Sequence, residues 1–158
     1  MKYSTLTIDN YELLYAFYHN ELAYFGLKEK GLEDIKKDFP HEVLEYEENL
    51  NHEFENEINE YFKGALTKFN TPLYISGTNF QRSVYKVLKD VPYGKTISYT
   101  ELASELGDVK KVRAVANAVG RNRHLILMPC HRIIAKDGSL GGFSAGLDLK
   151  KVLLAIES

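Results

Sequence analysis

The chain has 158 residues, of which 44% are hydrophobic and 27% are charged, as in a small folded protein. Its single cysteine, Cys130, excludes an internal disulfide framework and a zinc site built from several cysteines. No apolar run approaches ~20 residues, which excludes a membrane-spanning helix, and the start of the chain has no apolar signal core. We therefore expect a cytoplasmic protein.

Charge is divided unevenly along the chain. The formal net charge is −2, but residues 1–76 hold 7 basic and 15 acidic residues, whereas residues 77–158 hold 13 basic and 7 acidic residues. The change of sign predicts an N-terminal lobe over 1–76 and a second domain over 77–158. Its excess of positive charge makes the second domain the candidate for binding a polyanion.

The N-terminal segment predicts a small sheet followed by a helix. Residues 3–27 are rich in Tyr, Phe, Leu and Thr and are broken by Asp-Asn and His-Asn pairs, a pattern typical of three antiparallel strands. Apolar residues then recur at spacings of three and four from Val43 to Phe62, with glutamates between them. This periodicity predicts a helix whose acidic face is exposed.

The second half predicts helices with clear starting signals. Thr78–Gln81 and Ser98–Glu101 fit capping boxes, and the helix opened by Ser98 stops at Gly107. Asp108 caps a third helix to about Gly120, so the last two helices form a helix-turn-helix pattern.

The third helix predicts two opposite stripes. One is apolar (Val109, Val112, Ala116, Val119) and the other is polar (Lys110, Arg113, Asn117 and Gly120 or Arg121). Small residues on this helix, such as Ala114, would allow a phosphate backbone to approach. A DNA-recognition helix and an ordinary amphipathic helix with a solvated basic face both fit this pattern.

Cys130 lies in the apolar run 125–134, where a lone cysteine is most often an inert buried residue. Pro129 restricts the backbone before it, and His131 and Arg132 add two neighbours that favour a thiolate when charged. A deprotonated cysteine is a strong nucleophile and histidine is the usual residue to take its proton, so the segment favours a reactive thiol over an inert one, without assigning a direct Cys–His dyad. In an extended segment these side chains point to opposite sides, so their contact requires a bend at Pro129 or a bridging water.

The loop over residues 136–144 is rich in glycine but matches no phosphate-binding or dinucleotide-binding motif. Two interpretations stay open: a loop that supplies backbone N–H groups to a small pocket, and a plain turn.

From Gly77 to Glu157 the chain resembles the active-site domain of the O6-alkylguanine-DNA alkyltransferases, also called methylated-DNA–protein-cysteine methyltransferases. The matching motifs follow in order with consistent spacing: Gly77-Thr78, Phe80-Gln81, Pro92-Tyr93-Gly94, Ser98-Tyr99, Leu102-Ala103, Arg113-Ala114-Val115, Asn122, Pro129-Cys130-His131-Arg132, Gly138 and Leu153-Leu154-Ala155. The Pro-Cys-His-Arg core with the upstream arginine and asparagine is highly specific. The N-terminal half matches only in its layout.

The resemblance implies an α+β fold. Its N-terminal lobe would be ribonuclease H-like, an antiparallel three-stranded sheet with a helix, and its C-terminal lobe mostly helical and winged-helix-like. It also implies one irreversible transfer of an alkyl group from O6-alkylguanine in double-stranded DNA to Cys130, after minor-groove binding and nucleotide flipping. O4-alkylthymine stays open as a second substrate. We expect no metal, no cofactor, no membrane association and no obligate protein partner, and therefore a monomer.

The resemblance also assigns roles to residues. Cys130 would accept the alkyl group, His131 would remove its proton through a water, Glu157 would orient His131, and Tyr99 would assist the leaving guanine. Asn122 would tie the recognition helix to the active-site segment. Arg113 would replace the flipped nucleotide, with further DNA contacts from Tyr99, Lys110, Ala114, Asn117 and Arg121. The base pocket would be lined by Met128, Pro129, Phe143 and Ser144.

Four residues depart from the family's usual pattern: Tyr85 for Trp, Ala116 for Gly, Arg123 for Pro and Phe143 for Tyr. Two other functions stay open. One is a protein that binds alkylated bases without chemistry, although such relatives replace the acceptor cysteine. The other is a helix-turn-helix regulatory DNA-binding protein with an incidental buried cysteine.

Overall fold

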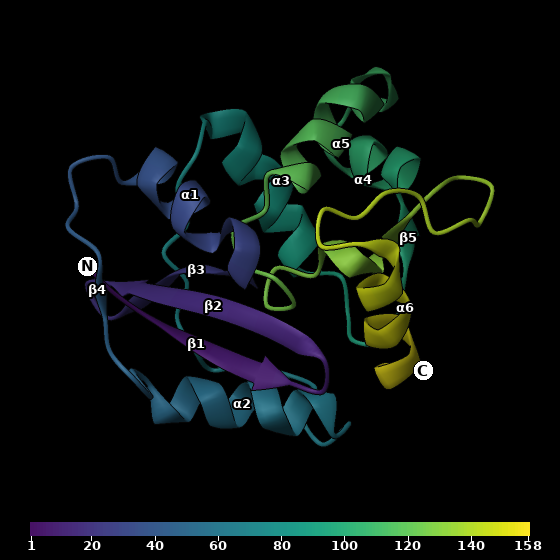
Figure 1. Ribbon diagram of the computed structural model, residues 1–158. Coiled ribbons are helices and arrows are strands. Elements are labelled where there is room, and N and C mark those ends of the chain that lie inside the picture. Colours follow the sequence, from purple (N-terminus) through teal and green to yellow (C-terminus); the bar gives the residue numbers. More distant parts are fainter. The chain divides into compact units, whose positions relative to one another are not determined.

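The computed structural model describes residues 1–158, which divide into two units, Met1–Tyr74 and Ile75–Ser158. The first unit contains a mixed sheet and the second is mostly helical, so the fold is α+β as predicted (Figure 1). None of the helices combines the length and the apolar character that crossing a membrane requires.

The sheet of the first unit begins as the predicted antiparallel meander and gains one strand. Its strands are β1 (Lys2–Ile8), β2 (Tyr11–Tyr18), β3 (Glu21–Leu27) and β4 (Glu45–Tyr46), in the order β3-β2-β1-β4. The three long strands confirm the meander, and β4 pairs with β1 in parallel. Only two residues form β4, which is too short to leave a periodic signal in the sequence.

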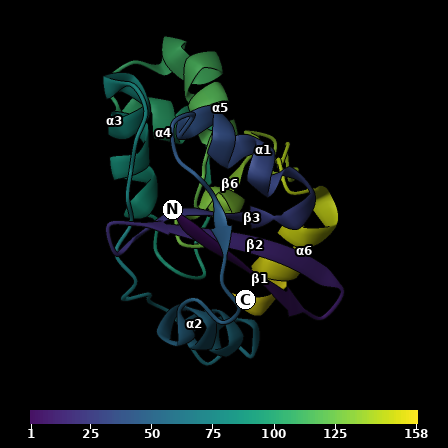
Figure 2. The same ribbon diagram turned by 60° about the vertical axis from the view of Figure 1, so that its left-hand side comes forward.

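Two helices cover the two faces of this sheet (Figure 2). On one face, Leu14 of β2 packs with Ile35 of α1 (Lys28–Asp38). On the other face, the rings of Tyr15 and Phe54 lie 4.9 Å apart, and Phe54 belongs to α2 (His52–Phe62). Because both faces are covered, β2 is buried continuously over residues 13–16 and does not alternate.

The helix predicted from Val43 begins only at His52, so its predicted start was wrong. Asn51 sets the actual start, because its side chain accepts a hydrogen bond from the Phe54 N–H at 2.9 Å. Val43 is 74% exposed before the helix.

The sequence analysis also missed α1, which is mostly charged and buries only Gly31 and Ile35. A Cβ at Gly31 would lie 2.9 Å from the Leu14 side chain, so glycine allows α1 to approach the sheet closely.

The second unit contains α3 (Asn79–Lys89), β5 (Ile97–Ser98), α4 (Tyr99–Glu105), the 3₁₀ turn η1 (Val109–Lys111), α5 (Val112–Gly120), the 3₁₀ turn η2 (Cys130–Arg132), β6 (Ile133–Ile134) and α6 (Leu147–Ile156). The helices α3, α4 and α5 pack on one another, and β5 pairs with β6 in parallel. The capping box at Thr78 is confirmed. The Ser98 and Asp108 side chains cap α4 and η1 as predicted.

The apolar stripe predicted for the third helix was partly right, since Val119 is buried and Val112 and Ala116 are half-buried. The buried residues of α5 are Val115, Ala118 and Val119, whereas Val109 is 52% exposed. The tighter 3₁₀ turn over residues 109–111 rotates Val109 away from the face that the α-helical period assigns to it.

Candidate active site

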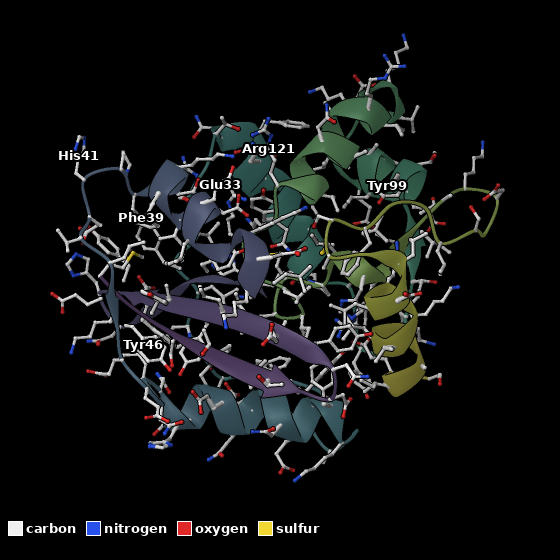
Figure 3. The ribbon with its side chains drawn as sticks, viewed as in Figure 1. Glu33, Phe39, His41, Tyr46, Tyr99 and Arg121 are labelled. Carbon is white, nitrogen blue, oxygen red and sulfur yellow. The ribbon has the colours of Figure 1, made fainter.

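A cavity of about 420 Å³ in the second unit is lined in part by Cys130, the only cysteine. Its lining comes from α4, α5, η2 and the loop after β6: Tyr99, Ala116, Val119, Gly120, Cys130, Gly142, Phe143 and Ser144. Figure 3 shows Tyr99 at the start of α4. The cavity has the size of a small-molecule site and brings four predicted residues together, namely Tyr99, Cys130, Phe143 and Ser144.

The segment 124–130, which leads into this cavity, is buried and sharply turned. Ile126 has φ = 71°, a conformation that a β-branched residue rarely adopts. At Pro129 (φ −78°, ψ 62°) the Cys130 N–H donates to the Met128 carbonyl at 2.7 Å, which forms an inverse γ-turn. Cys130 thus begins the turn η2, and the extended backbone considered for this segment is replaced by a bend at Pro129.

Asn122 connects the end of α5 to the cysteine. Its Nδ2 donates to the Met128 carbonyl at 3.0 Å and to Cys130 Sγ at 3.1 Å, and it lies 3.3 Å from the His124 carbonyl. Its Oδ1 accepts a hydrogen bond from the His124 N–H at 2.9 Å. One amide therefore satisfies backbone groups of a buried loop and also contacts the sulfur.

Glu157 is buried and held by several partners, although it is the penultimate residue. Its Oε2 lies 2.6 Å from His131 Nε2, and Arg132 donates to both carboxylate oxygens, at 2.8 and 3.0 Å. The Gly94 N–H adds a longer bond of 3.3 Å, and Arg132 also donates to the Val91 carbonyl at 2.7 Å. This bidentate arrangement fixes the carboxylate that contacts the imidazole.

Burial controls the protonation states at this site. It raises the pKa of Cys130 to about 11, despite the hydrogen bond from Asn122 and the charge of Lys150, which both lower it. Burial also lowers the pKa of His131, against the raising effect of Glu157. At neutral pH, Cys130 is therefore a thiol and His131 is neutral and able to accept a proton.

These pKa directions run against the expectation that His131 and Arg132 favour the Cys130 thiolate. Burial outweighs nearby charge at the sulfur, and the charge of Arg132 is paired with Glu157. The pKa of Tyr99 is raised by burial and by the neighbouring Cys130, so its hydroxyl remains a donor at neutral pH.

A second hollow, of about 770 Å³, shares Tyr99 and Ala116 with the cavity. Its other lining residues are Thr100, Lys110, Val112, Arg113, Ala135 and Lys136. It thus places Lys110 and Arg113 beside the cysteine cavity. The remaining predicted DNA contacts of α5 and its end are Ala114, Asn117 and Arg121, and all three are exposed (Arg121 is labelled in Figure 3).

Some predicted pocket residues lie elsewhere, and other residues take their place. Met128 and Pro129 are buried immediately before Cys130 and are not among the residues that line the cavity. Ala116, Val119, Gly120 and Gly142, which the sequence analysis did not name as pocket residues, complete the lining. Gly142 belongs to the glycine-rich loop 136–144, which the sequence analysis offered as a loop that supplies backbone N–H groups to a small pocket.

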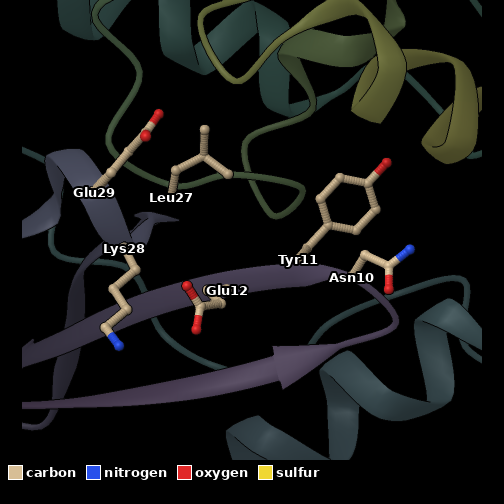
Figure 4. Close-up of a pocket in the computed structure, with 6 residues that line it drawn as sticks. All are labelled: Asn10, Tyr11, Glu12, Leu27, Lys28 and Glu29. Atoms are coloured by element: carbon tan, nitrogen blue, oxygen red, sulfur yellow. The ribbon is translucent and has the colours of Figure 1, made fainter.

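The first unit has a hollow of its own, of about 490 Å³ (Figure 4). It lies between the β1–β2 turn and the start of α1, and is lined by Asn10, Tyr11, Glu12, Leu27, Lys28 and Glu29. None of the predicted site residues belongs to it. No group of three or more His, Cys, Asp or Glu residues is placed to hold a metal ion.

Known proteins match this chain along most of its length. Residues 79–158 match the family model described as 6-O-methylguanine DNA methyltransferase, DNA binding domain. The inducible methylated-DNA–protein-cysteine methyltransferase of Bacillus subtilis is 36% identical over 140 residues, which cover 86% of this chain and 78% of the relative. A methylated-DNA–protein-cysteine methyltransferase of Methanosarcina acetivorans is 42% identical over 134 residues, which cover 84% and 85%.

The structure agrees with these sequence matches. The crystal structure of Mycobacterium tuberculosis OGT in complex with DNA superimposes with a TM-score of 0.88 and 32% identity, covering 99% of this chain and 92% of that one. The fold is therefore that of a DNA alkyltransferase. The chain belongs to the O6-methylguanine DNA methyltransferase family.

Proposed function

We propose that this protein repairs DNA by transferring the alkyl group of O6-alkylguanine to its own Cys130. The observation that carries the proposal is that Cys130 lines a cavity of small-molecule size, its sulfur accepts a hydrogen bond from Asn122, and the next residue, His131, is paired with Glu157. Two relatives named methylated-DNA–protein-cysteine methyltransferase support the same activity.

The transfer is a displacement at the alkyl carbon. His131 accepts the thiol proton through a water molecule, the sulfur–carbon bond forms, and the carbon–O6 bond breaks with its electron pair passing to guanine. Tyr99 donates a hydrogen bond to the leaving guanine as negative charge develops on it. The thioether product has no good leaving group, so each protein molecule reacts once.

The DNA partner is a duplex that contains alkylated guanine. The basic face formed by Lys110 and Arg113 adjoins the cavity, which supports binding in the minor groove with the damaged base flipped into the cavity. Arg113 takes the place of the flipped nucleotide, and Ala114, Asn117 and Arg121 contact the surrounding DNA. Residues 77–158 form the DNA-binding and active-site domain of a cytoplasmic monomer, and residues 1–76 form a separate lobe.

The test is intact-protein mass spectrometry after incubation with a duplex containing O6-methylguanine. One methyl group per molecule is expected, located on Cys130 by peptide mapping, and none with the unmethylated duplex. Cys130→Ala should bind the methylated duplex without acquiring the group. An unmodified Cys130 after prolonged incubation with bound substrate would overturn the proposal and favour a protein that binds lesions without chemistry.

A further inference from the structure

The helix α3 carries three positively charged side chains that the proposed function does not use. Arg82, Lys86 and Lys89 are all exposed. Their spacings of four and three residues place them on one face of the helix, which we call the α3 stripe. None of the three belongs to the buried side of α3, so the α3 stripe is open to solvent along its length.

No acidic side chain neutralises the α3 stripe. Arg82 Nη2 donates to the amide oxygen of Asn79 at 2.6 Å, and neither of the two lysines forms an ion pair. Residues 75–100 contain four basic residues and a single acidic one, Asp90. In the first unit, by contrast, several exposed lysines pair with glutamates. The α3 stripe therefore presents charges that an anionic partner can neutralise.

The stability of the helix does not account for all three charges. Positive side chains in the last turn, here Lys86 and Lys89, interact favourably with the helix dipole. Arg82 lies in the first turn, where the dipole favours negative side chains, and the first turn of α3 contains no acidic residue. Positive charges at both ends of one face fit a surface that binds a line of negative charges.

The α3 stripe adjoins α5, the helix that the proposed function places on DNA, and the two helices pack on each other (Figure 1). The Ala118 carbonyl of α5 accepts a hydrogen bond from the Tyr85 hydroxyl at 2.9 Å and another from the Arg121 N–H at 3.1 Å. Near the start of α3, Lys111 Nζ lies 5.8 Å from the centroid of the Phe80 ring. Positive residues of the α5 segment therefore border α3 at two points.

The length of the α3 stripe suits the backbone of a DNA strand. From Arg82 to Lys89 an α-helix rises about 10.5 Å. The phosphates of one strand follow each other every ~3.4 Å along the duplex axis, so this length spans about three of them. Arginine and lysine side chains bind such phosphates without reading the base sequence.

We propose that the α3 stripe is a second DNA contact, in which Arg82, Lys86 and Lys89 bind phosphates that flank the segment bound by α5. This inference rests on the proposed function, in which duplex DNA is the partner. The contact adds affinity without sequence preference, so it holds the protein on undamaged and damaged duplexes alike.

The test measures the salt dependence of DNA binding in Cys130→Ala protein, on which a methylated duplex stays unreacted. The logarithm of the binding constant falls linearly with the logarithm of the salt concentration, with a slope of about −0.9 per phosphate contact. Arg82→Gln, Lys86→Gln and Lys89→Gln should each reduce the magnitude of this slope by about 0.9, and the α3 triple variant by about 2.7. Fluorescence anisotropy of a labelled duplex gives the binding constants.

The control is a second triple variant, Lys30→Gln, Lys36→Gln and Lys37→Gln. It removes three exposed charges from α1, a helix of 11 residues like α3, and should leave the slope unchanged. Circular dichroism and thermal unfolding verify that both triple variants are folded at the temperature of the measurement. An unchanged slope in the α3 triple variant, or an equal reduction in the α1 triple variant, overturns the proposal.

Two further measurements identify the kind of contact. Methylated and unmethylated duplexes should lose the same factor in affinity in the α3 triple variant, because phosphate contacts do not read the base. In ethylation interference, one group of phosphates should stop interfering in the α3 triple variant, and a different group in Lys110→Gln. A loss confined to the methylated duplex, or an interference pattern identical to that of the unaltered stripe, contradicts the proposal.

Binding and methyl transfer are measured separately, so the two proposals can fail independently. If the wild type transfers no methyl group, the proposed function fails, and the salt slopes on unmethylated duplex still decide whether the α3 stripe binds DNA. If the wild type transfers the methyl group and the α3 triple variant keeps the original slope, only the inference about α3 is overturned.

Discussion

Cys130 combines a position suited to attack with surroundings that oppose its ionisation. Burial raises the pKa of Cys130 to about 11, so the residue is a thiol at pH 7. A nucleophile of this kind depends on a base that removes its proton during the reaction. In the proposed function that base is His131, whose Nε2 lies 2.6 Å from Glu157 Oε2.

At the scale of single residues, we predict the effect of Glu157→Gln on the pH dependence of methyl transfer. The single-turnover rate should fall ~10- to 100-fold, the size of a general-base contribution. Transfer requires neutral His131, so the rate falls as the pH drops through the His131 pKa, which lies below 6.5. Since Glu157 raises that pKa, its loss should move this acid limb to still lower pH. Quenched-flow measurements across the acidic and neutral pH range give both the single-turnover rate and the pH at which it falls.

The control for this prediction is Glu105→Gln, which changes an exposed glutamate at the end of α4. It should leave the rate and the acid limb unchanged. Thermal unfolding should accompany both variants, because Glu157→Gln leaves the buried Arg132 guanidinium without its counter-charge. A slow variant with an unmoved acid limb would show that Glu157 only supports the fold.

At the scale of elements, the decisive connection runs from the end of α5 to η2. The loop between them is buried, and buried loops leave backbone groups that need partners. Asn122 supplies several of these partners and also contacts the sulfur. One side chain therefore connects the end of α5 to the segment that carries Cys130.

Asn122→Ala should lower the free energy of unfolding by about 2–3 kcal/mol, because it removes several hydrogen bonds and leaves buried carbonyls unsatisfied. Methyl transfer should slow as well, since the sulfur loses a donor that lowers its pKa. Urea unfolding followed by circular dichroism measures the first effect. The matched control is Asn117→Ala on the exposed face of α5, which should change stability by less than ~0.5 kcal/mol. Equal losses in the two variants would contradict the role of Asn122.

At the scale of the whole molecule, the two units differ in charge and in what they contain. The first unit is acidic and contains a sheet that is covered on both faces. The second unit contains the cysteine cavity and, beside it, the hollow lined by Lys110 and Arg113. In the proposed reaction, duplex DNA has to contact the hollow with Lys110 and Arg113 and also enter the cysteine cavity, whereas a free alkylated base has to enter only the cavity.

Arg113→Ala should therefore reduce transfer from methylated duplex far more than transfer from free O6-methylguanine. Only the duplex requires a side chain to replace the flipped nucleotide. Both rates are measured by mass spectrometry of Cys130. Lys151→Ala, which removes an exposed positive charge from α6, is the charge-matched control and should affect neither rate strongly. Equal losses on both substrates would show that Arg113 has no special role in extrusion.

Local signals predicted a large part of the fold. Turn pairs and segments rich in Tyr, Phe, Leu and Thr predicted the three long strands, and Thr78, Ser98 and Asp108 predicted the starts of helical segments. These features depend on residues within one or two turns of each other. The two elements that the sequence analysis missed depend on contacts between distant residues. The helix α1 is held by packing on the sheet, and β4 forms by pairing with the edge of β1.

The sequence by itself determined the reactive residue, its neighbours His131 and Arg132, and the basic character of the half that carries them. Only the tertiary structure decided the state of the thiol. Folding buries Cys130, pairs the charge of Arg132 with Glu157, and brings Lys150 into contact with the backbone of Gly142, which lines the cavity. The physical reason is that the ionisation of a buried group depends on its desolvation and on the charges around it in space, which the order of residues does not specify.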